Sequence, residues 1–248
     1  MVLLCGIDEA GRGPVIGPLV ICGVLIQEED EPSLKSIGVK DSKLITPEKR
    51  SEIYEILKEK VKYKLLIISP QEIDEALQSN EINLNWLEAI KSVEIINFLK
   101  PEKAILDCPS NNIKAYTNYL KARVEDKSIE LISEHKADFN HLIVGAASIL
   151  AKVTRDREIE RLKKKIGIDF GSGYPSDPVT RDFLIKNYKK YPEIFRKEWA
   201  SYKEAANIEN FDNHLLCQNS QRELCSKNIK KSGCTKFPIK KQKSLSDY

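Results

Sequence analysis

Two adjacent acidic residues near the start of the chain are the side chains best suited to chemistry. The stretch LLCGIDEAGRGPVIGP places Asp8 and Glu9 at the end of an apolar segment and just before the turn Gly11-Arg12-Gly13. Two carboxylates in one site repel each other unless a cation offsets their charge. Mg²⁺ prefers oxygen ligands and often shares its coordination with substrate phosphates, while glycines let backbone N–H groups approach a ligand. The pattern therefore predicts a metal-dependent reaction on a phosphodiester.

Two aspartates at the ends of later elements are candidates for the same site. Asp107 ends a predicted strand, and Asp138 lies at the start of a predicted helix. Ligands of α/β proteins bind at strand ends, so separate segments can converge there, and four carboxylates can hold two Mg²⁺ ions roughly 3.5–4 Å apart. Simpler interpretations remain open, because Asp138 also fits a helix N-cap and Asp107 also fits a cap of the turn that follows it.

The elements around these acids alternate between strand and helix patterns. Residues 2–9 and 17–26 are rich in Val, Ile and Leu and are joined by a short Gly/Pro turn, which favours an antiparallel pair. Further strands are predicted over 61–68, 103–107 and 129–133, and helices over 47–60, after Ser69-Pro70, and over 83–100, 111–122, 139–164, 178–190 and 193–208. This order predicts an α/β fold with a mixed sheet flanked by helices. Strand alternation points Asp8 and Glu9 to opposite faces, so the sequence does not show how both reach one site.

Composition and charge divide the chain into a body with mixed charge and a basic tail. The chain has 248 residues, of which 41% are hydrophobic and 31% charged, and no apolar run of membrane-spanning length or signal-peptide pattern. Residues 210–248 hold eight Lys/Arg against three Asp/Glu and lose helical periodicity. Six cysteines lack zinc-like spacing, and Cys5 and Cys22 lie in apolar strands as small buried side chains. We expect reduced thiols and a cytoplasmic monomer with no membrane association.

Six motifs, in one order, resemble the ribonuclease HII family. They are DEAGRGP, DSKLI, LDCPS, HKAD, AASILAKVTRDREI and GSGYPSDP, and the resemblance covers about residues 1–208. It implies a ribonuclease H-like catalytic domain over 1–208, with a helical C-terminal part over about 175–208 and a polar tail over 209–248. It also implies an endonuclease of DNA replication and repair that hydrolyses the RNA strand of RNA–DNA hybrids and cleaves 5′ of ribonucleotides embedded in duplex DNA. Two Mg²⁺ or Mn²⁺ ions would support in-line attack by water, giving 3′-hydroxyl and 5′-phosphate ends.

The resemblance also assigns roles to individual residues. Carried over position by position, the family's catalytic and metal-binding acids are Asp8, Glu9, Asp107 and Asp138. The elements that read the ribose 2′-hydroxyl are the backbone of Gly11, Arg12 and Gly13, together with Tyr174. GRG, rather than GKG, resembles ribonuclease HII and not its HIII relative. A simpler interpretation of Tyr174 is a loop aromatic that packs on the core.

Three further residues match motifs that contact the nucleic-acid backbone. Lys43 in DSK resembles a phosphate-contacting lysine, and Ser148 and Lys152 match the AASILAK motif. A solvated loop lysine is the simpler interpretation of Lys43. The adjacent Arg155 and Asp156 are at least as consistent with an intramolecular salt bridge.

The end of the tail has the spacing of a sliding-clamp-binding box. In QKSLSDY, Gln242, Leu245 and Tyr248 match Q-x-x-aliphatic-x-x-aromatic, although the usual second aromatic is absent. An aliphatic and an aromatic anchor could enter an apolar pocket of the clamp. Because short patterns also arise by chance, clamp binding and an unpartnered tail both remain open.

Two other functions are worth testing against these motifs. A catalytically silent nucleic-acid-binding module on the same fold is disfavoured by the presence of all four acids. Dinucleotide binding through the GRG turn is disfavoured by spacing, because the next glycine is Gly17 and Pro14 leads into a strand-like run instead of a helix.

Overall fold

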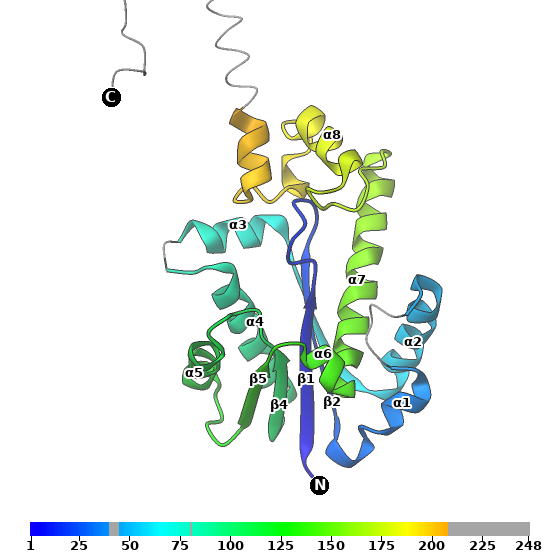
Figure 1. Cartoon of the computed structure of the whole chain (residues 1–248), viewed down its shortest axis with the longest axis vertical. Coiled ribbons are helices and arrows are strands. Elements are labelled where there is room, and N and C mark those ends of the chain that lie inside the picture. Colours follow the sequence, from blue (N-terminus) through cyan, green and yellow to red (C-terminus); the bar gives the residue numbers. More distant parts are fainter. Residues whose placement is uncertain (40–44, 80, 208–248) are drawn as a thin grey trace, which may run out of the picture. The chain divides into compact units, whose positions relative to one another are not determined.

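A five-stranded mixed sheet forms the centre of the protein (Figure 1). The computed structural model describes residues 1–39, 45–79 and 81–207. The strand order is β3-β2-β1-β4-β5, where the strands are β1 Leu3–Ala10, β2 Leu19–Gln27, β3 Lys62–Ile68, β4 Lys103–Asp107 and β5 Glu130–Glu134. Strands β1 to β3 pair antiparallel, whereas β4 pairs parallel with both β1 and β5. The predicted mixed sheet and the predicted antiparallel first pair are both confirmed.

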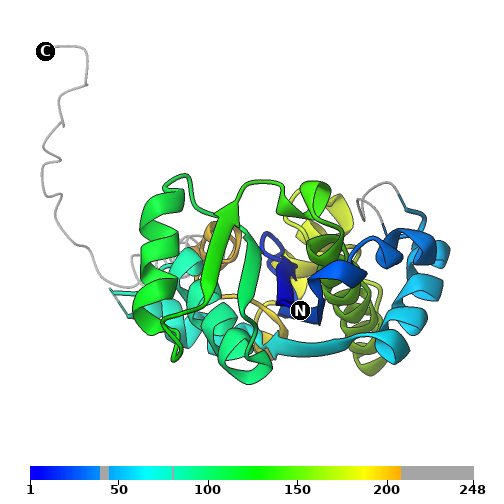
Figure 2. The ribbon, with the colours of Figure 1, turned by 90° about the horizontal axis from the view of Figure 1, so that it is seen from below.

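Helices cover both faces of this sheet, as Figures 1 and 2 show. The helices are α1 Ser33–Ile37, α2 Pro47–Lys60, α3 Pro70–Gln78, α4 Leu84–Leu99, α5 Ile113–Arg123, α6 Ala137–Asn140, α7 Leu142–Ile166 and α8 Pro178–Asn187. Along β1, Leu4 joins the core beneath α7, while Cys5 and Ile7 join the core beneath α4 and α5. Alternation therefore gives β1 two faces, each buried in a separate apolar core.

Local capping explains why several helices begin where the sequence predicts. The Thr46 hydroxyl accepts a hydrogen bond from the Lys49 N–H at 3.3 Å, and Ser69 accepts one from the Glu72 N–H at 3.1 Å. In both helices a proline occupies the first turn, where it has no N–H to leave unsatisfied. The predicted starts of α2 and α3 are thus confirmed by the contacts that cause them.

Helix α7 lies directly on β1 because Gly6 leaves no side chain between them. A Cβ atom at Gly6 would lie 2.6 Å from the Ile143 carbonyl carbon and the Val144 nitrogen. Gly6 shares its strand face with Asp8, two residues further on. The same face therefore presents Asp8 to the first turns of α7.

Two predicted helices differ from the structure. The single helix predicted over 139–164 is interrupted at His141, whose extended backbone (φ −124°, ψ 122°) separates α6 from α7. Phe139, an apolar residue at the start of that predicted helix, is 68% exposed and does not join the core. The helix predicted over 193–208 begins only at residue 200 among the described residues, because Phe195 is extended and bridges to Ile16.

The C-terminal part nevertheless packs into the body of the protein, whose compact unit spans Met1–Ala205. The buried side chains of Phe170, Phe183 and Phe195 contact one another there, with ring centroids 5.5 and 6.0 Å apart. Among the described residues, none of the helices combines the length and apolar character needed to span a membrane.

Candidate active site

The parallel pairing of β1 and β4 brings Asp8 and Asp107 together. The register pairs Gly6 with Ile105 and Ile7 with Leu106, so Asp8 and Asp107 are the next residues on the two strands. Residues paired in register point to the same side of a sheet, and here that side is covered by α7. Two acids that are 99 positions apart in the chain therefore become neighbours at one edge.

A hydrogen bond that α6 donates to the end of β4 positions the fourth acid, Asp138. Asp107 Oδ1 accepts from the Ala137 backbone N–H at 2.9 Å, which holds the start of α6 beside the end of β4. Asp138, the next residue, is buried in α6. His141, not Asp138, occupies the N-cap position of α7, so the simple capping interpretation of Asp138 is wrong for the long helix. Asp107 anchors α6 through its bond with the Ala137 N–H.

A cavity of about 300 Å³ opens between these elements and is lined by almost every residue that the sequence singles out. Its lining includes the four acids, the three residues of the GRG turn, and Ser148, Lys152 and Tyr174. Lys43 lies outside the described residues, as do Gln242, Leu245 and Tyr248 of the tail. All the predicted site residues that lie among the described residues therefore line this one cavity.

Glu9 reaches the same cavity from the other face of β1. By alternation its side chain lies on the α4 side, and Glu88 of α4 is the strongest charged influence that raises its pKa. Because Glu9 is the penultimate residue of β1, it still lines the cavity at the strand end. Asp8 and Glu9 can therefore line one cavity although they lie on opposite faces of β1.

Burial and mutual repulsion make the carboxylates costly to ionise. Burial, followed by the charges of Glu9 and Asp107, raises the pKa of Asp8 well above its usual value, although a hydrogen bond from Ser148 opposes this. Burial, Glu88 and Asp107 raise the pKa of Glu9 to about 8, and the Arg12 charge opposes them. A divalent cation with a preference for oxygen donors would relieve this repulsion.

The carboxylates fit a hard cation in chemical type, but they do not yet enclose one. In the described part of the chain, no three Asp, Glu, His or Cys side chains already form a complete ligand set. Mg²⁺ commonly keeps several waters and takes further oxygens from substrate phosphates, so an open set of acids suits it. Asp8, Glu9, Asp107 and Asp138 are the residues that could hold such an ion.

The GRG turn needs its glycines for both backbone shape and space. Gly11 has a φ of +88°, and a Cβ there would lie 2.8 Å from the Pro18 carbonyl oxygen. A Cβ at Gly13 would lie 3.3 Å from Cε1 of Tyr174. The tyrosine ring therefore sits against the turn, and its side chain is 38% exposed, so it is not simply packed into the core.

A buried arginine that sequence reasoning missed holds the backbone of this turn. Arg196 donates to the carbonyl oxygens of Gly11 at 2.7 Å, Arg12 at 3.1 Å and Gly17 at 3.0 Å. Burial lowers the pKa of Arg196 to about 9. No motif marked this residue, since its partners lie about 180 positions away in the chain. The only available signal was an arginine within an aromatic-rich segment, which is weak.

Two other basic residues were also missed or only partly interpreted. Arg50 of α2 lines the cavity, although no prediction included it. Arg155 is buried, donates to the Ser172 carbonyl oxygen at 3.1 Å and lies with its guanidinium carbon 5.4 Å from the Tyr174 ring centroid. The expected Arg155–Asp156 ion pair is present at 3.6 Å, but Asp156 also accepts from Lys152 at 2.7 Å. Arg155 therefore supports the tyrosine loop as well.

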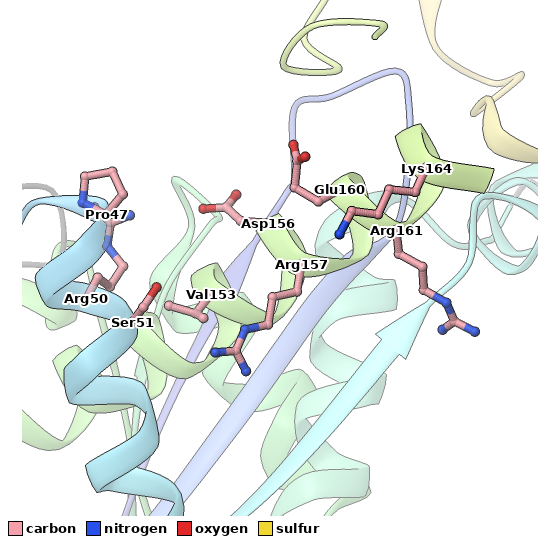
Figure 3. Close-up of a pocket in the computed structure, with 9 residues that line it drawn as sticks. All are labelled: Pro47, Arg50, Ser51, Val153, Asp156, Arg157, Glu160, Arg161 and Lys164. Carbon is pink, nitrogen blue, oxygen red and sulfur yellow. The ribbon is translucent and has the colours of Figure 1, made fainter. Parts of the chain in front are cut away.

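Arg50 also lines a second cavity of about 490 Å³ between α2 and α7 (Figure 3). Its basic side chains include Arg157, Arg161 and Lys164 along α7, interspersed with Asp156 and Glu160. Arg50, which lines both cavities, connects the acidic site to this second cavity, whose lining has a net positive charge. Such a surface suits a polyanion that runs past the acids.

Comparison with known proteins identifies the family. The family model described as "Ribonuclease HII" matches residues 5–202. The chain belongs to the ribonuclease HII family. A ribonuclease HII of Methanococcus maripaludis is 47% identical over 209 residues, which cover 81% of this chain and 86% of the relative. Ribonuclease HII enzymes are metal-dependent nucleases that cleave RNA in RNA–DNA hybrids, and the chain is an enzyme of this kind.

Solved structures of ribonuclease HII proteins share the fold. The ribonuclease H2 of Pyrococcus horikoshii OT3 aligns with a TM-score of 0.76 and 44% identity, covering 83% of this chain and 98% of that one. A ribonuclease HII of Archaeoglobus fulgidus, in a complex with PCNA, aligns with a TM-score of 0.71 and 41% identity, covering 80% and 95%. The predicted ribonuclease H-like fold is thereby confirmed.

Proposed function

We propose that this enzyme hydrolyses the RNA strand of RNA–DNA hybrids and also cleaves 5′ of single ribonucleotides embedded in duplex DNA. One observation carries the proposal: four carboxylates and a glycine turn packed against a tyrosine line the same cavity. The acids suit phosphodiester hydrolysis, and the turn and tyrosine suit recognition of one ribose. A site with both parts can select a single 2′-hydroxyl within DNA.

Asp8, Glu9, Asp107 and Asp138 would hold the divalent ions, Mg²⁺ or Mn²⁺, with two bound when substrate is present. When bound, such ions activate the attacking water and stabilise the leaving 3′-oxygen. Other residues of the chain hold two of these carboxylates in place: Ser148 hydrogen-bonds Asp8, and the Ala137 N–H of α6 hydrogen-bonds Asp107. In-line attack by water leaves a 3′-hydroxyl and a 5′-phosphate, so the 2′-hydroxyl serves recognition and not attack.

The ribose is read by the backbone of Gly11, Arg12 and Gly13 and by the Tyr174 hydroxyl. The ring of Tyr174 lies against Gly13 and is backed by Arg155, which limits its freedom. Such a pre-organised tyrosine can stack on a sugar or base while its hydroxyl bonds to the 2′-oxygen. DNA lacks that oxygen and would leave the tyrosine unpaired.

Ser148, Lys152 and Arg50 would contact the phosphodiester backbone next to the cleavage site. Lys43 remains a further proposed phosphate contact. Phosphate contacts fix the register of a duplex without reading its sequence, so the enzyme should cleave in many sequence contexts. We further propose that it acts as a cytoplasmic monomer in DNA replication and repair.

A duplex with one embedded ribonucleotide tests this function directly. The intact enzyme should cleave on the 5′ side of the ribonucleotide with Mg²⁺ and not without it, leaving a 5′-phosphate. Asp8→Asn should bind the same duplex but cleave it at least about a thousandfold more slowly, because a ligand of the ions is lost. Binding by the intact protein without cleavage under any divalent ion would instead support a silent nucleic-acid-binding module.

We also propose that the tail binds a sliding clamp through Gln242, Leu245 and Tyr248. The Archaeoglobus fulgidus relative forms a complex with PCNA, which is a sliding clamp, and this favours a clamp as the partner. Deleting residues 242–248 should abolish clamp binding, measured by calorimetry, and leave cleavage of a short duplex unchanged. Equal clamp affinity of the full chain and the truncated chain would reject the proposal.

A further inference from the structure

A fifth carboxylate, Glu88, lies behind the ribose-reading turn on the α4 side. Arg12 donates from Nη1 to Glu88 Oε2 and from Nη2 to Asn85 Oδ1. Asn85 and Glu88 are three residues apart and therefore share one face of the first turns of α4. The guanidinium of the GRG turn is thus held by two side chains of a helix that is remote in sequence.

Glu88 is unusual because it is a carboxylate in an almost fully buried position. Its side chain is only 3% exposed, and among the described residues its Oε1 atom has no hydrogen-bond partner. A buried carboxylate is expensive unless it is paired, and a buried ion pair is often no more stable than apolar residues of the same size. Packing stability is therefore a poor reason for a glutamate at this position.

The turn is fixed from two directions. Arg196 holds the carbonyl oxygens of Gly11 and Arg12, and Trp199 Nε1 donates to the Gly13 carbonyl oxygen at 3.2 Å. These contacts hold the main chain from the C-terminal part of the body. Glu88 and Asn85 of α4 hold the side chain of Arg12, the central residue of the turn.

We propose that Glu88, supported by Asn85, is a positioning residue that acts through Arg12 to fix the turn against the substrate ribose. The inference rests on the proposed reading of the 2′-hydroxyl by this turn. Because both Arg12 amino groups face α4 partners, the arginine side chain serves as an anchor for the turn, and the backbone around it is what faces the ligand. Glu88 is then a determinant of ribose selectivity that never touches the substrate.

The test compares binding of two duplexes that differ by one 2′-hydroxyl. The full-length protein binds an all-DNA duplex and the same duplex with one ribonucleotide, with Ca²⁺ in place of Mg²⁺ to prevent cleavage. Glu88→Gln should reduce the preference for the ribonucleotide about tenfold, equivalent to one well-formed hydrogen bond, and leave affinity for the all-DNA duplex unchanged. Asn85→Ala should reduce the preference in the same direction by about threefold.

Glu94→Gln is the matched control. Glu94 is an exposed glutamate on the same helix, where it faces Lys91, and the same chemical change there should leave the preference intact. Arg12→Met and the Arg12→Met/Glu88→Gln pair complete a double-mutant cycle. If Glu88 acts through Arg12, adding Glu88→Gln to Arg12→Met should cause no further loss of preference.

Three results would overturn the inference. They are an unchanged preference in Glu88→Gln, an equal loss of affinity for both duplexes, and additive losses in the cycle. Thermal unfolding of each variant shows whether it is folded, and should Glu88→Gln be unfolded, the decision falls to Asn85→Ala, whose site is only partly buried. An intact protein with no preference between the duplexes would instead refute the proposed function itself.

Discussion

The two faces of the last residues of β1 carry acids in opposite electrostatic settings. On the α7 face, Asp8 lies near Asp107, and the influences that lower its pKa are hydrogen bonds from Ser148 and the Glu9 backbone. On the α4 face, burial raises the pKa of both Glu9 and Glu88, Glu88 raises that of Glu9 further, and the Arg12 charge opposes both rises. On the first face hydrogen bonds oppose the rise in the pKa of Asp8, whereas on the second face a cation, Arg12, opposes the rise in the pKa of Glu9.

This difference separates two uses of buried acids. Acids that the protein leaves uncompensated must wait for an external cation, which makes them suitable for metal-dependent chemistry. Acids that the protein neutralises are suited to holding structure. Burial raises the pKa of Glu88 to about 7 even though Arg12 lowers it, so its ionisation depends on the arginine. Glu9 lies at the boundary, since it lines the cavity but senses both Glu88 and Arg12.

The largest expected effect is the loss of cleavage rate when an acid of the cavity is replaced. Asp138→Asn should slow cleavage of an embedded-ribonucleotide duplex by roughly three orders of magnitude, because several kcal/mol of ion-based stabilisation are lost. Asp182→Asn, an exposed control on α8 that pairs with Lys186, should retain full activity. Single-turnover rates at saturating enzyme measure the difference. A loss below tenfold for Asp138→Asn would remove it from the metal site.

The next effect is the pH dependence of the stability that Mg²⁺ adds to the folded protein. Acids whose folded-state pKa lies above the unfolded value stabilise the fold at low pH, and this contribution is lost as pH rises through the folded pKa. For Glu9, with a pKa raised to about 8, the loss should extend between about pH 4 and 8 in metal-free protein, and the raised pKa of Asp8 adds a loss of the same sign. Mg²⁺ should therefore raise the unfolding temperature more at pH 8 than at pH 5.5, by on the order of 5 °C. Equal Mg²⁺ effects at both pH values would contradict the idea that Mg²⁺ relieves the cost of ionising Asp8 and Glu9.

A smaller effect should come from the ribose-reading side of the cavity. Tyr174→Phe keeps the ring against Gly13 but removes the hydroxyl, so kcat/KM on the embedded ribonucleotide should fall about tenfold. The Mg²⁺ dependence should be unchanged, since the tyrosine is not among the acids. Comparing kcat/KM over a Mg²⁺ titration checks both points, and a shifted Mg²⁺ requirement would show that the two parts of the cavity are not separable.

The smallest effect should come from the hydrogen bond that Ser148 makes with Asp8. Ser148→Ala removes a contact that stabilises the Asp8 carboxylate, so the pKa of Asp8 should rise further. Half-saturation by Mg²⁺ should then require about threefold more ion, with the rate at saturating Mg²⁺ nearly unchanged, as expected for loss of less than 1 kcal/mol. A lower maximal rate with unchanged half-saturation would show that the proposed phosphate contact of Ser148 matters more to catalysis than its hydrogen bond with Asp8.

Local chemistry explains most of the elements that sequence reasoning identified. Thr46 and Ser69 act as N-caps at the predicted starts of α2 and α3, and β4 has the predicted limits of 103–107. The break at His141 was missed because neither glycine nor proline marks it. It arises where Asp107 anchors Ala137 and where α7 must settle on Gly6, and both of these are long-range contacts.

From the sequence alone came the candidate acids, the turn and the tyrosine, because each is a local motif with a chemical reason for its residue types. Only the tertiary structure decided how they meet: the parallel register of β1 and β4 joins Asp8 to Asp107, and the end of β1 lets Glu9 enter from the opposite face. The anchors Arg196 and Glu88 belong to the structure as well. Their partners are 76 or more positions away, and no local preference of the chain encodes a contact over that separation.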